Sequence, residues 1–323
     1  MSQPDVAQQE LRTLMKRFLK THSSPGDRIV LAVSGGPDSI AMAAICAELK
    51  TEFSLDFYCV NINHQLQDAA FEWAEKTIAI CRQLGFENAV SIAVDVDQNS
   101  GVGLEAAARD ARYKALRDYA SSVDARAIML AHTMDDQAET VLMRISRGSS
   151  TRSLAGMAHI TKDLWRPLLD LERQTLHKAL MSLGIETISD PHNFDRQFTR
   201  VKIRLDVIPA LISALGQNIV TGLARTARMA RMDADALEQI ASKLYPKLLI
   251  ENELLIGELI NQPLAIQTRI VHHWLLSRGV PANSLSSDHV FSVCRMAADP
   301  RLKGPMKVAG GVEVQKASGR LRT

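Results

Sequence analysis

The chain contains few cysteines and no long apolar run. Its four cysteines among 323 residues lie far apart and form no Cys-x-x-Cys pair. Neither a disulfide framework nor a cysteine metal site is therefore indicated, and we expect reduced, mostly buried thiols. The N-terminus is polar, and no stretch approaches the roughly 20 apolar residues that a membrane span requires. We predict a cytoplasmic protein without membrane contact.

The chain also lacks a strong excess of charge of one sign. Its formal net charge is +2 at pH 7. This balance permits an RNA partner without demanding one, so any nucleic-acid surface must be a local patch. The length suggests about two domains and suffices to bury a core.

A glycine loop at 34–39 separates a strand-like apolar run at 29–33 from a helix-like run at 40–49. A strand, a glycine turn and a helix start present backbone N–H groups and the positive end of the helix dipole to an anion. The loop lacks the lysine of the P-loop and the spacing of a dinucleotide fold. An ordinary turn would use the same residue types. The candidate phosphate cradle consists of Ser34, Gly35, Gly36, Pro37, Asp38 and Ser39.

Strand-like and helical runs alternate after the loop. This order predicts an α/β fold, a parallel sheet with helices on both faces, and ligands bind such sheets at the carboxyl ends of the strands. His64, Asp97 and His132 follow strand ends there. Helices predominate beyond Pro209, so we expect a first domain at 1–210 and a smaller, mostly helical domain at 211–323. The expected strands are 55–62, 89–94 and 127–131; the expected helices are 7–20, 67–84, 104–121, 171–183 and 219–237.

Acidic and basic pairs occupy two of the expected helices. Asp136 and Glu139 share one face near a helix start, where they could complement the helix dipole or, beside a nucleotide loop, serve a metal or act as a base. Arg109 and Arg112 follow Glu105 at helical spacing. They could form an intrahelical pair with Glu105 or face a polyanion or a developing phosphate charge.

Two further segments are rich in arginine. One contains Arg200 and Arg204, and the other carries Arg225, Arg228 and Arg231 at three-residue intervals. From spacing alone, each segment is either a solvated helix face or a nucleic-acid surface.

Six sequence blocks, in order between residues 28 and 210, resemble tRNA(Ile)-lysidine synthases, members of the PP-loop ATP pyrophosphatase superfamily. The chain departs from the family pattern at 61–67, where Asn-Ile-Asn-His-Gln-Leu-Gln replaces a histidine-rich segment, and at Thr133, where the family has a second histidine. The blocks are the loop 34–39, Glu105 to Tyr113, Ala131 to Gly148, Arg166 to Leu169, Asp190-Pro191-x-Asn193, and Arg200-x-x-x-Arg204.

The resemblance implies an adenine nucleotide alpha-hydrolase-like PP-loop fold and a ligase that uses ATP. The implied reaction joins L-lysine to C2 of the wobble cytidine of tRNA(Ile) with a CAU anticodon. The C2 oxygen attacks the α-phosphorus of ATP, pyrophosphate leaves, and the lysine amine then displaces AMP. The product is lysidine.

The resemblance also implies roles for the matching residues. Asp38 and Asp136 would hold Mg²⁺, and Arg109 or Arg112 would stabilise charge on the α-phosphate. Glu139 would hold or deprotonate the lysine amine, which must be neutral to attack. The implied ATP site comprises the loop 34–39 and His132, and the resemblance favours tRNA contacts by Arg200 and Arg204. From the second arginine-rich segment we also predict tRNA contacts by Arg225 and Arg228.

Two alternatives share the loop. A PP-loop tRNA thiolase would use the same adenylate chemistry, but its usual paired cysteines are missing. A nucleotide-binding module without catalysis would need neither the carboxylates nor the arginine-rich segment. A homodimer is compatible with the sequence.

Overall fold

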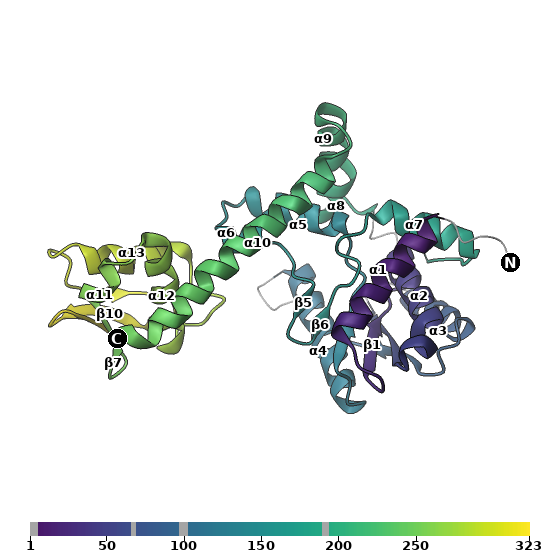
Figure 1. Ribbon diagram of the computed structural model, residues 1–323, viewed down its shortest axis with the longest axis horizontal. Helices are drawn as coiled ribbons and strands as arrows, with labels where there is room; N and C mark the ends of the chain where they lie inside the picture. The colour runs from purple at the N-terminus through teal and green to yellow at the C-terminus, as the bar shows by residue number, and fades with distance from the viewer. Residues whose placement is uncertain (1–5, 66–68, 97–102, 189–193) are drawn as a thin grey trace. The chain divides into compact units, whose positions relative to one another are not determined.

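The computed structural model describes residues 6–65, 69–96, 103–188 and 194–323 (Figure 1). It divides into two compact units, Met1–Arg228 and Met229–Thr323, called here the first and second unit. No single helix of the described part is both long and apolar enough to cross a membrane.

A six-stranded sheet forms the centre of the first unit, in the order β3-β2-β1-β4-β6-β5. All neighbouring pairs are parallel except β5 and β6, which form an antiparallel hairpin that the sequence analysis missed. The predicted parallel sheet is confirmed. Its strands are β1 (Arg28–Ala32), β2 (Asp56–Asn63), β3 (Ala89–Ala93), β4 (Ala127–Met129), β5 (Ile160–Thr161) and β6 (Leu164–Trp165).

Helices cover both faces of this sheet. Ile29 and Leu31 of β1 join the hydrophobic cluster beneath α1, α2, α3 and α7, whereas Val30 joins the cluster beneath α4. Alternate side chains of a strand point to opposite faces, so a strand buried on both sides reads as a continuous apolar run. These helices are α1 (Val6–His22), α2 (Pro37–Phe53), α3 (Ala70–Gln83), α4 (Leu104–Ser122) and α7 (Arg173–Leu183).

The strand order reverses between β1 and β4. The chain passes from β1 outward to β2 and β3 and then returns to the other side of β1 as β4. Ligands bind α/β sheets at such a switch point, outside the carboxyl ends of the strands. The helices α2 and α5 (Met134–Ile145) both begin at this edge, directly after β1 and β4.

The rest of the first unit is helical. After α6 (Thr151–Leu154) and the β5–β6 hairpin, the chain forms α8 (Thr199–Lys202), a π-helical turn (Ile203–Val207) and α9 (Ile208–Leu215). The long helix α10 (Ile219–Leu244) continues past the boundary at Arg228 and contributes to both units.

The second unit packs short helices on a small antiparallel sheet, in the order β7-β8-β11-β10-β9. Its core surrounds Trp274, which is fully buried. The expected mostly helical domain is confirmed, with more strand than the sequence indicated. The elements are β7 (Leu249–Ile250), β8 (Glu253–Leu255), α11 (Ile256–Ile260), α12 (Leu264–Ser277), α13 (Ser287–Ala298), β9 (Met306–Lys307), β10 (Glu313–Ala317) and β11 (Arg320–Arg322).

All four cysteines are buried and none forms a disulfide. Burial raises the pKa of the Cys294 thiol to about 11, so that thiol is protonated at neutral pH. The expectation of buried thiols is confirmed, and their reduced state stays a prediction.

Candidate active site

The loop at 34–39 has a backbone that only glycine accommodates. Gly35 has φ of 86°, and a Cβ at this position would lie 2.5 Å from Oγ1 of Thr77 in α3. The carbonyl of Gly35 accepts a hydrogen bond from the N–H of Ile188 at 3.0 Å. The loop is therefore packed closely against α3 and hydrogen-bonded to Ile188, and Pro37 occupies the first turn of α2.

The two serines of the loop bond to it rather than extending away from it. The hydroxyl of Ser39 donates to the Gly36 carbonyl at 2.9 Å and accepts from the Ser34 N–H at 3.1 Å. The two hydroxyl groups lie 3.2 Å apart. These bonds fix the turn at the start of α2, where backbone N–H groups and the helix dipole favour a phosphate.

A pocket of about 370 Å³ opens at the switch point and is lined by loop residues and by three basic side chains. These are His64 after β2, Arg112 from α4 and His132 after β4. Each has a buried ring or guanidinium nitrogen without a hydrogen-bond partner among the described residues. Buried polar groups normally have partners, so these atoms indicate a polar ligand in the pocket.

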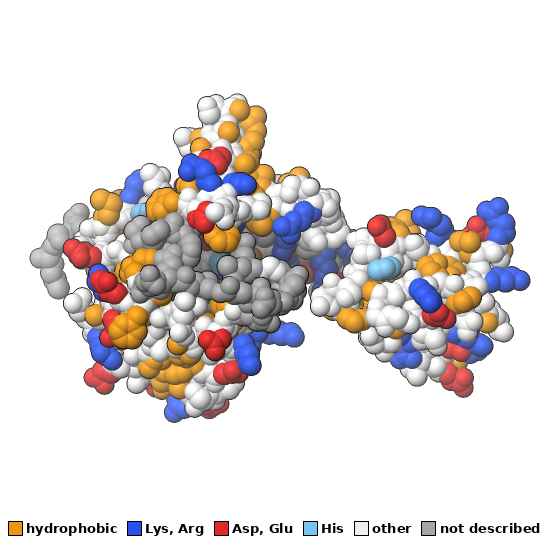
Figure 2. All heavy atoms as spheres, turned by 180° about the vertical axis from the view of Figure 1, so that it is seen from behind, with side chains coloured by type: hydrophobic (Ala, Val, Ile, Leu, Met, Phe, Trp, Pro, Cys, Tyr) orange, Lys and Arg blue, Asp and Glu red, His pale blue; other side chains and the backbone are white. Residues whose placement is uncertain are grey.

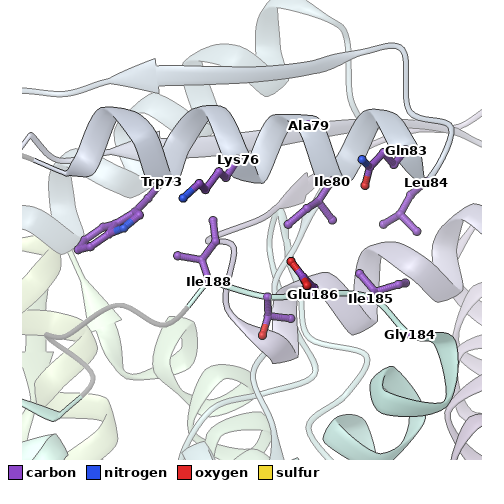
Figure 3. Close-up of a pocket in the computed structure, with 11 residues that line it drawn as sticks. Trp73, Lys76, Ala79, Ile80, Gln83, Leu84, Gly184, Ile185, Glu186 and Ile188 are labelled. Carbon is purple, nitrogen blue, oxygen red and sulfur yellow. The ribbon is translucent and has the colours of Figure 1, made fainter.

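A larger cavity, about 780 Å³, lies between α3 and residues 184–188 (Figure 3). Figure 3 shows Trp73 and Lys76 on α3 opposite Ile188 and Glu186. None of the predicted site residues lines this larger cavity. The smaller pocket instead is lined by five of the predicted site residues, Ser34, Asp38, Ser39, Arg112 and His132.

Glu139 is the centre of a cluster of ion pairs beside the loop. Its side chain is 0% exposed, and its two oxygens receive Nε of Arg204 at 2.7 Å, Nε of Arg200 at 2.8 Å and Nη1 of Arg173 at 3.4 Å. A carboxylate this deeply buried requires such partners. The predicted tRNA contacts Arg200 and Arg204 thus lie at the carboxylate cluster.

Asp136 belongs to the same cluster and also forms a capping box with Thr133 at the start of α5. Its Oδ2 accepts from the N–H and hydroxyl of Thr133 at 2.8 and 2.9 Å, and its Oδ1 lies 3.0 Å from Nη2 of Arg173. Burial alone would raise the pKa of this carboxyl, but Arg173 and Arg200 outweigh burial and lower it to about 2. Thr133, a departure from the family pattern, therefore serves as the N-cap of α5.

The chain matches two domain families and many related proteins. A PP-loop domain covers residues 6–211, and the TilS substrate binding domain covers 254–322. The tRNA(Ile)-lysidine synthase of Thermobifida fusca is 38% identical over 99% of this chain and 98% of the relative. That of Mycobacterium tuberculosis H37Rv is 36% identical over 95% and 92%.

The chain belongs to the tRNA(Ile)-lysidine synthase family. The resemblance predicted from the sequence blocks is confirmed, and the PP-loop domain implies that the chain binds ATP. Among solved structures, the U34-tRNA thiolase NcsA from Methanococcus maripaludis has a TM-score of 0.58 at 16% identity, covering 70% of this chain and 80% of that one. At this identity the likeness shows the shared fold alone.

The family's arginine pair on α4 surrounds one aromatic ring. The guanidinium carbons of Arg109 and Arg112 lie 4.9 and 5.2 Å from the ring centroid of Tyr113. Arg112 lines the pocket and Arg109 does not. Burial lowers the pKa of the Arg112 guanidinium. The side chain of Glu105, the expected intrahelical partner, lies outside the described residues.

Arg225 and Arg228 stand apart from this cluster. Both side chains are exposed on α10, and neither forms an ion pair within the described part of the chain. Figure 2 shows lysine and arginine side chains gathered at the base of the projection formed by α9. Asp97 and the motif residues Asp190, Pro191 and Asn193 lie outside the described residues.

Arg173, the first residue of α7, was not among the site residues predicted from the sequence. Its guanidinium contacts Asp38 at 3.1 Å as well as Asp136 and Glu139. A signal was available, because a basic residue in the first turn of a helix opposes the helix dipole. Such a residue indicates carboxylate partners from elsewhere in the fold.

His132 gives the first unit a predictable pH dependence. Burial lowers its pKa to about 3, so as the pH falls below about 6.5 the unfolded chain takes up a proton that the folded chain does not. Stability should fall by roughly 2 kcal/mol between about pH 6.5 and about pH 5. Urea unfolding should show this loss in the wild type and a flatter profile for His132→Gln.

His22→Gln on α1 is the matched control, because His22 lies outside the pocket. An equal pH slope for the wild type and His132→Gln would contradict the assignment of the pH dependence to His132.

Proposed function

We propose that this chain adenylates the wobble cytidine of tRNA(Ile) with a CAU anticodon and then attaches L-lysine, releasing pyrophosphate and AMP. One observation carries the proposal: Arg173 bridges Asp38 after β1 and Asp136 after β4. Two carboxylates that belong to separate sequence motifs therefore lie together beside the phosphate loop. The resulting site combines an anion cradle with acidic groups, as adenylation by ATP requires.

The pocket suits the nucleotide. The loop 34–39 and the start of α2 would hold phosphate oxygens through backbone N–H groups. Arg112 is half-buried at the pocket wall, where it would stabilise charge on the α-phosphate. His132 is neutral near pH 7 because of its low pKa, so it would contact the nucleotide as an uncharged donor or acceptor.

The carboxylates suit Mg²⁺ shared with phosphates. Oδ1 of Asp38 is buried, accepts no hydrogen bond within the described part of the chain, and lies 3.3 Å from Nε2 of His177 on α7. No group of three His, Cys, Asp or Glu residues that could hold a metal occurs among the described residues. Mg²⁺ in nucleotide sites typically uses one or two carboxylates and the substrate phosphates, which Asp38 and Asp136 provide. When bound, the ion would neutralise phosphate charge.

The assignment of Glu139 to the lysine amine stays a prediction. Three guanidinium groups engage its two oxygens. Before it accepts a proton or an ammonium group, at least one arginine must release it. Arg200 and Arg204 are the partners from α8 and the π-helical turn, so tRNA contacts by these arginines would free Glu139 for lysine.

The exposed pair on α10 is proposed to contact tRNA phosphates. The double variant Arg225→Gln/Arg228→Gln should bind tRNA more weakly, and the slope of log affinity against log salt should fall by about 1.4 to 1.8, since each phosphate contact contributes roughly 0.7 to 0.9. Filter binding over a range of salt concentrations measures this slope.

ATP affinity should be unchanged in that variant. Arg126→Gln, which removes an exposed arginine paired with Asp27, is the matched control. An unchanged salt slope in the double variant would mean that both arginines lie on a solvated helix face and make no tRNA phosphate contact.

A trapping experiment tests the proposed function. With ATP labelled at the α-phosphate and lysine omitted, labelled adenylated tRNA should accumulate and survive an acid quench. Added lysine should then discharge the label as AMP. A protein that binds ATP but never labels tRNA would be a nucleotide-binding module.

The thiolase alternative lacks support from the cysteines, which are all buried. If activity is retained after all four cysteines are changed to serine, the thiolase alternative is excluded. We expect the protein to act in the cytoplasm, where its tRNA substrate occurs, and a homodimer stays an expectation.

A further inference from the structure

The three nitrogens of the Arg173 guanidinium face three different carboxylates. Nε lies 3.1 Å from Oδ2 of Asp38, Nη2 lies 3.0 Å from Oδ1 of Asp136, and Nη1 lies 3.4 Å from Oε1 of Glu139. The side chain is only 17% exposed. A planar guanidinium spreads five N–H donors over three nitrogens, so it reaches carboxylates that lie too far apart for the single nitrogen of an ammonium group.

The backbone of Arg173 is fixed to the same place. Its N–H donates to Oδ2 of Asp135 at 2.7 Å, so a side chain of α5 satisfies the start of α7. Glu172, at the N-cap position, makes no capping bond with its side chain. Since a cation in the first helical turn is locally unfavourable, the carboxylates of α2 and α5 account for this arginine.

The cluster pairs its carboxylates with guanidinium groups. Arg173, Arg200 and Arg204 contact the carboxylates of Asp38, Asp136 and Glu139. At its edge, Asp135 accepts the N–H of Arg173, and Nε2 of His177 lies 3.3 Å from Oδ1 of Asp38. Burial alone would lower the pKa of the Arg173 guanidinium, but Asp136, Asp38 and Glu139 outweigh burial and raise it. Arg173 therefore stays charged and lies against Oδ2 of Asp38 and Oδ1 of Asp136, directly beside the position that a divalent cation would take.

We infer that Arg173 is a positioning residue that keeps Asp38 and Asp136 together and blocks cation binding until nucleotide arrives. The inference rests on the proposed function, because it takes these two carboxylates as the cation ligands. A divalent cation placed about 4 Å from the retained guanidinium meets strong repulsion. The triphosphate offers Arg173 new acceptor oxygens, so the guanidinium can leave the carboxylates when nucleotide and cation bind together.

Binding of Mn²⁺ alone, measured by electron paramagnetic resonance without nucleotide, tests this inference. Arg173→Met should bind Mn²⁺ at least about tenfold more tightly than the wild type, because a unit charge opposing the ion is gone. Arg126→Met, which removes an exposed arginine, should match the wild type. Arg173→Lys should fall between them, because an ammonium group reaches fewer of the carboxylates.

Arg173→Lys also serves if Arg173→Met does not fold. The inference is overturned if every folded variant at position 173 binds Mn²⁺ no better than the wild type. The proposed cation ligands are tested separately, by the effect of Asp38→Asn on Mn²⁺ binding to the otherwise wild-type protein in the presence of ATP. Unchanged binding there would remove Asp38 as a ligand.

Discussion

Asp38→Ala is expected to lower tRNA-dependent pyrophosphate release by about a thousandfold or more, equivalent to roughly 4 kcal/mol of transition-state stabilisation. The substitution removes a carboxylate assigned to Mg²⁺ and leaves triphosphate charge uncompensated. It also removes the partner of Nε of Arg173, so the bridge between α2 and α5 is lost at the phosphate loop. A coupled assay for pyrophosphate measures the effect.

Asp163→Ala provides the matched control, because this aspartate pairs with Arg117 at 2.7 Å away from the carboxylate cluster. Pyrophosphate release by Asp38→Ala at the wild-type rate would remove Asp38 from the proposed site. Mg²⁺ titration of both variants shows whether the defect concerns the ion.

Glu139→Gln is expected to separate the two chemical steps. If Glu139 serves the lysine amine, this variant should still adenylate tRNA, but lysine should then displace AMP from C2 slowly. Asp136→Asn should instead lose pyrophosphate release. Raising the pH should partly rescue Glu139→Gln, because more of the lysine amine is then neutral without a base. Acid-quench trapping with α-labelled ATP measures the accumulated adenylate.

The burial of Glu139 sets a control for that experiment. Removing one partner of a buried ion-pair cluster costs roughly 3 to 5 kcal/mol, so the stability of the variant must be measured beside its activity. If the folded Glu139→Gln and Asp136→Asn variants both stop before pyrophosphate release at every pH, both carboxylates belong to the ATP site.

The loop and the sheet were predictable from the sequence because their signals are local. The apolar run at 29–33 is buried on both faces of the sheet, and Gly35 adopts the positive φ that adjacent glycines permit. The strands of the second unit were largely missed, since runs of two or three residues such as β7 and β8 are too short to show a period.

The arginine cluster could not be predicted because its contacts are distant in the sequence. Arg173 reaches Asp38, 135 positions away, and Arg204 reaches Glu139, 65 positions away. Spacing along the chain placed Asp136 and Glu139 on one helix face but could not indicate that both would be buried against arginines. The role of Thr133 as N-cap was also hidden, because comparison with a family pattern marked it only as a departure.

Mass analysis of nucleosides shows directly whether this chain forms lysidine. Purified protein is incubated with ATP, Mg²⁺, L-lysine and tRNA(Ile) carrying a CAU anticodon, and the tRNA is then digested to nucleosides. We expect one cytidine per tRNA to be replaced by lysidine, with dependence on ATP and on lysine and no product from Asp38→Ala. Unmodified cytidine after incubation with active, ATP-binding protein, or a thiolated nucleoside in its place, would contradict the proposed function.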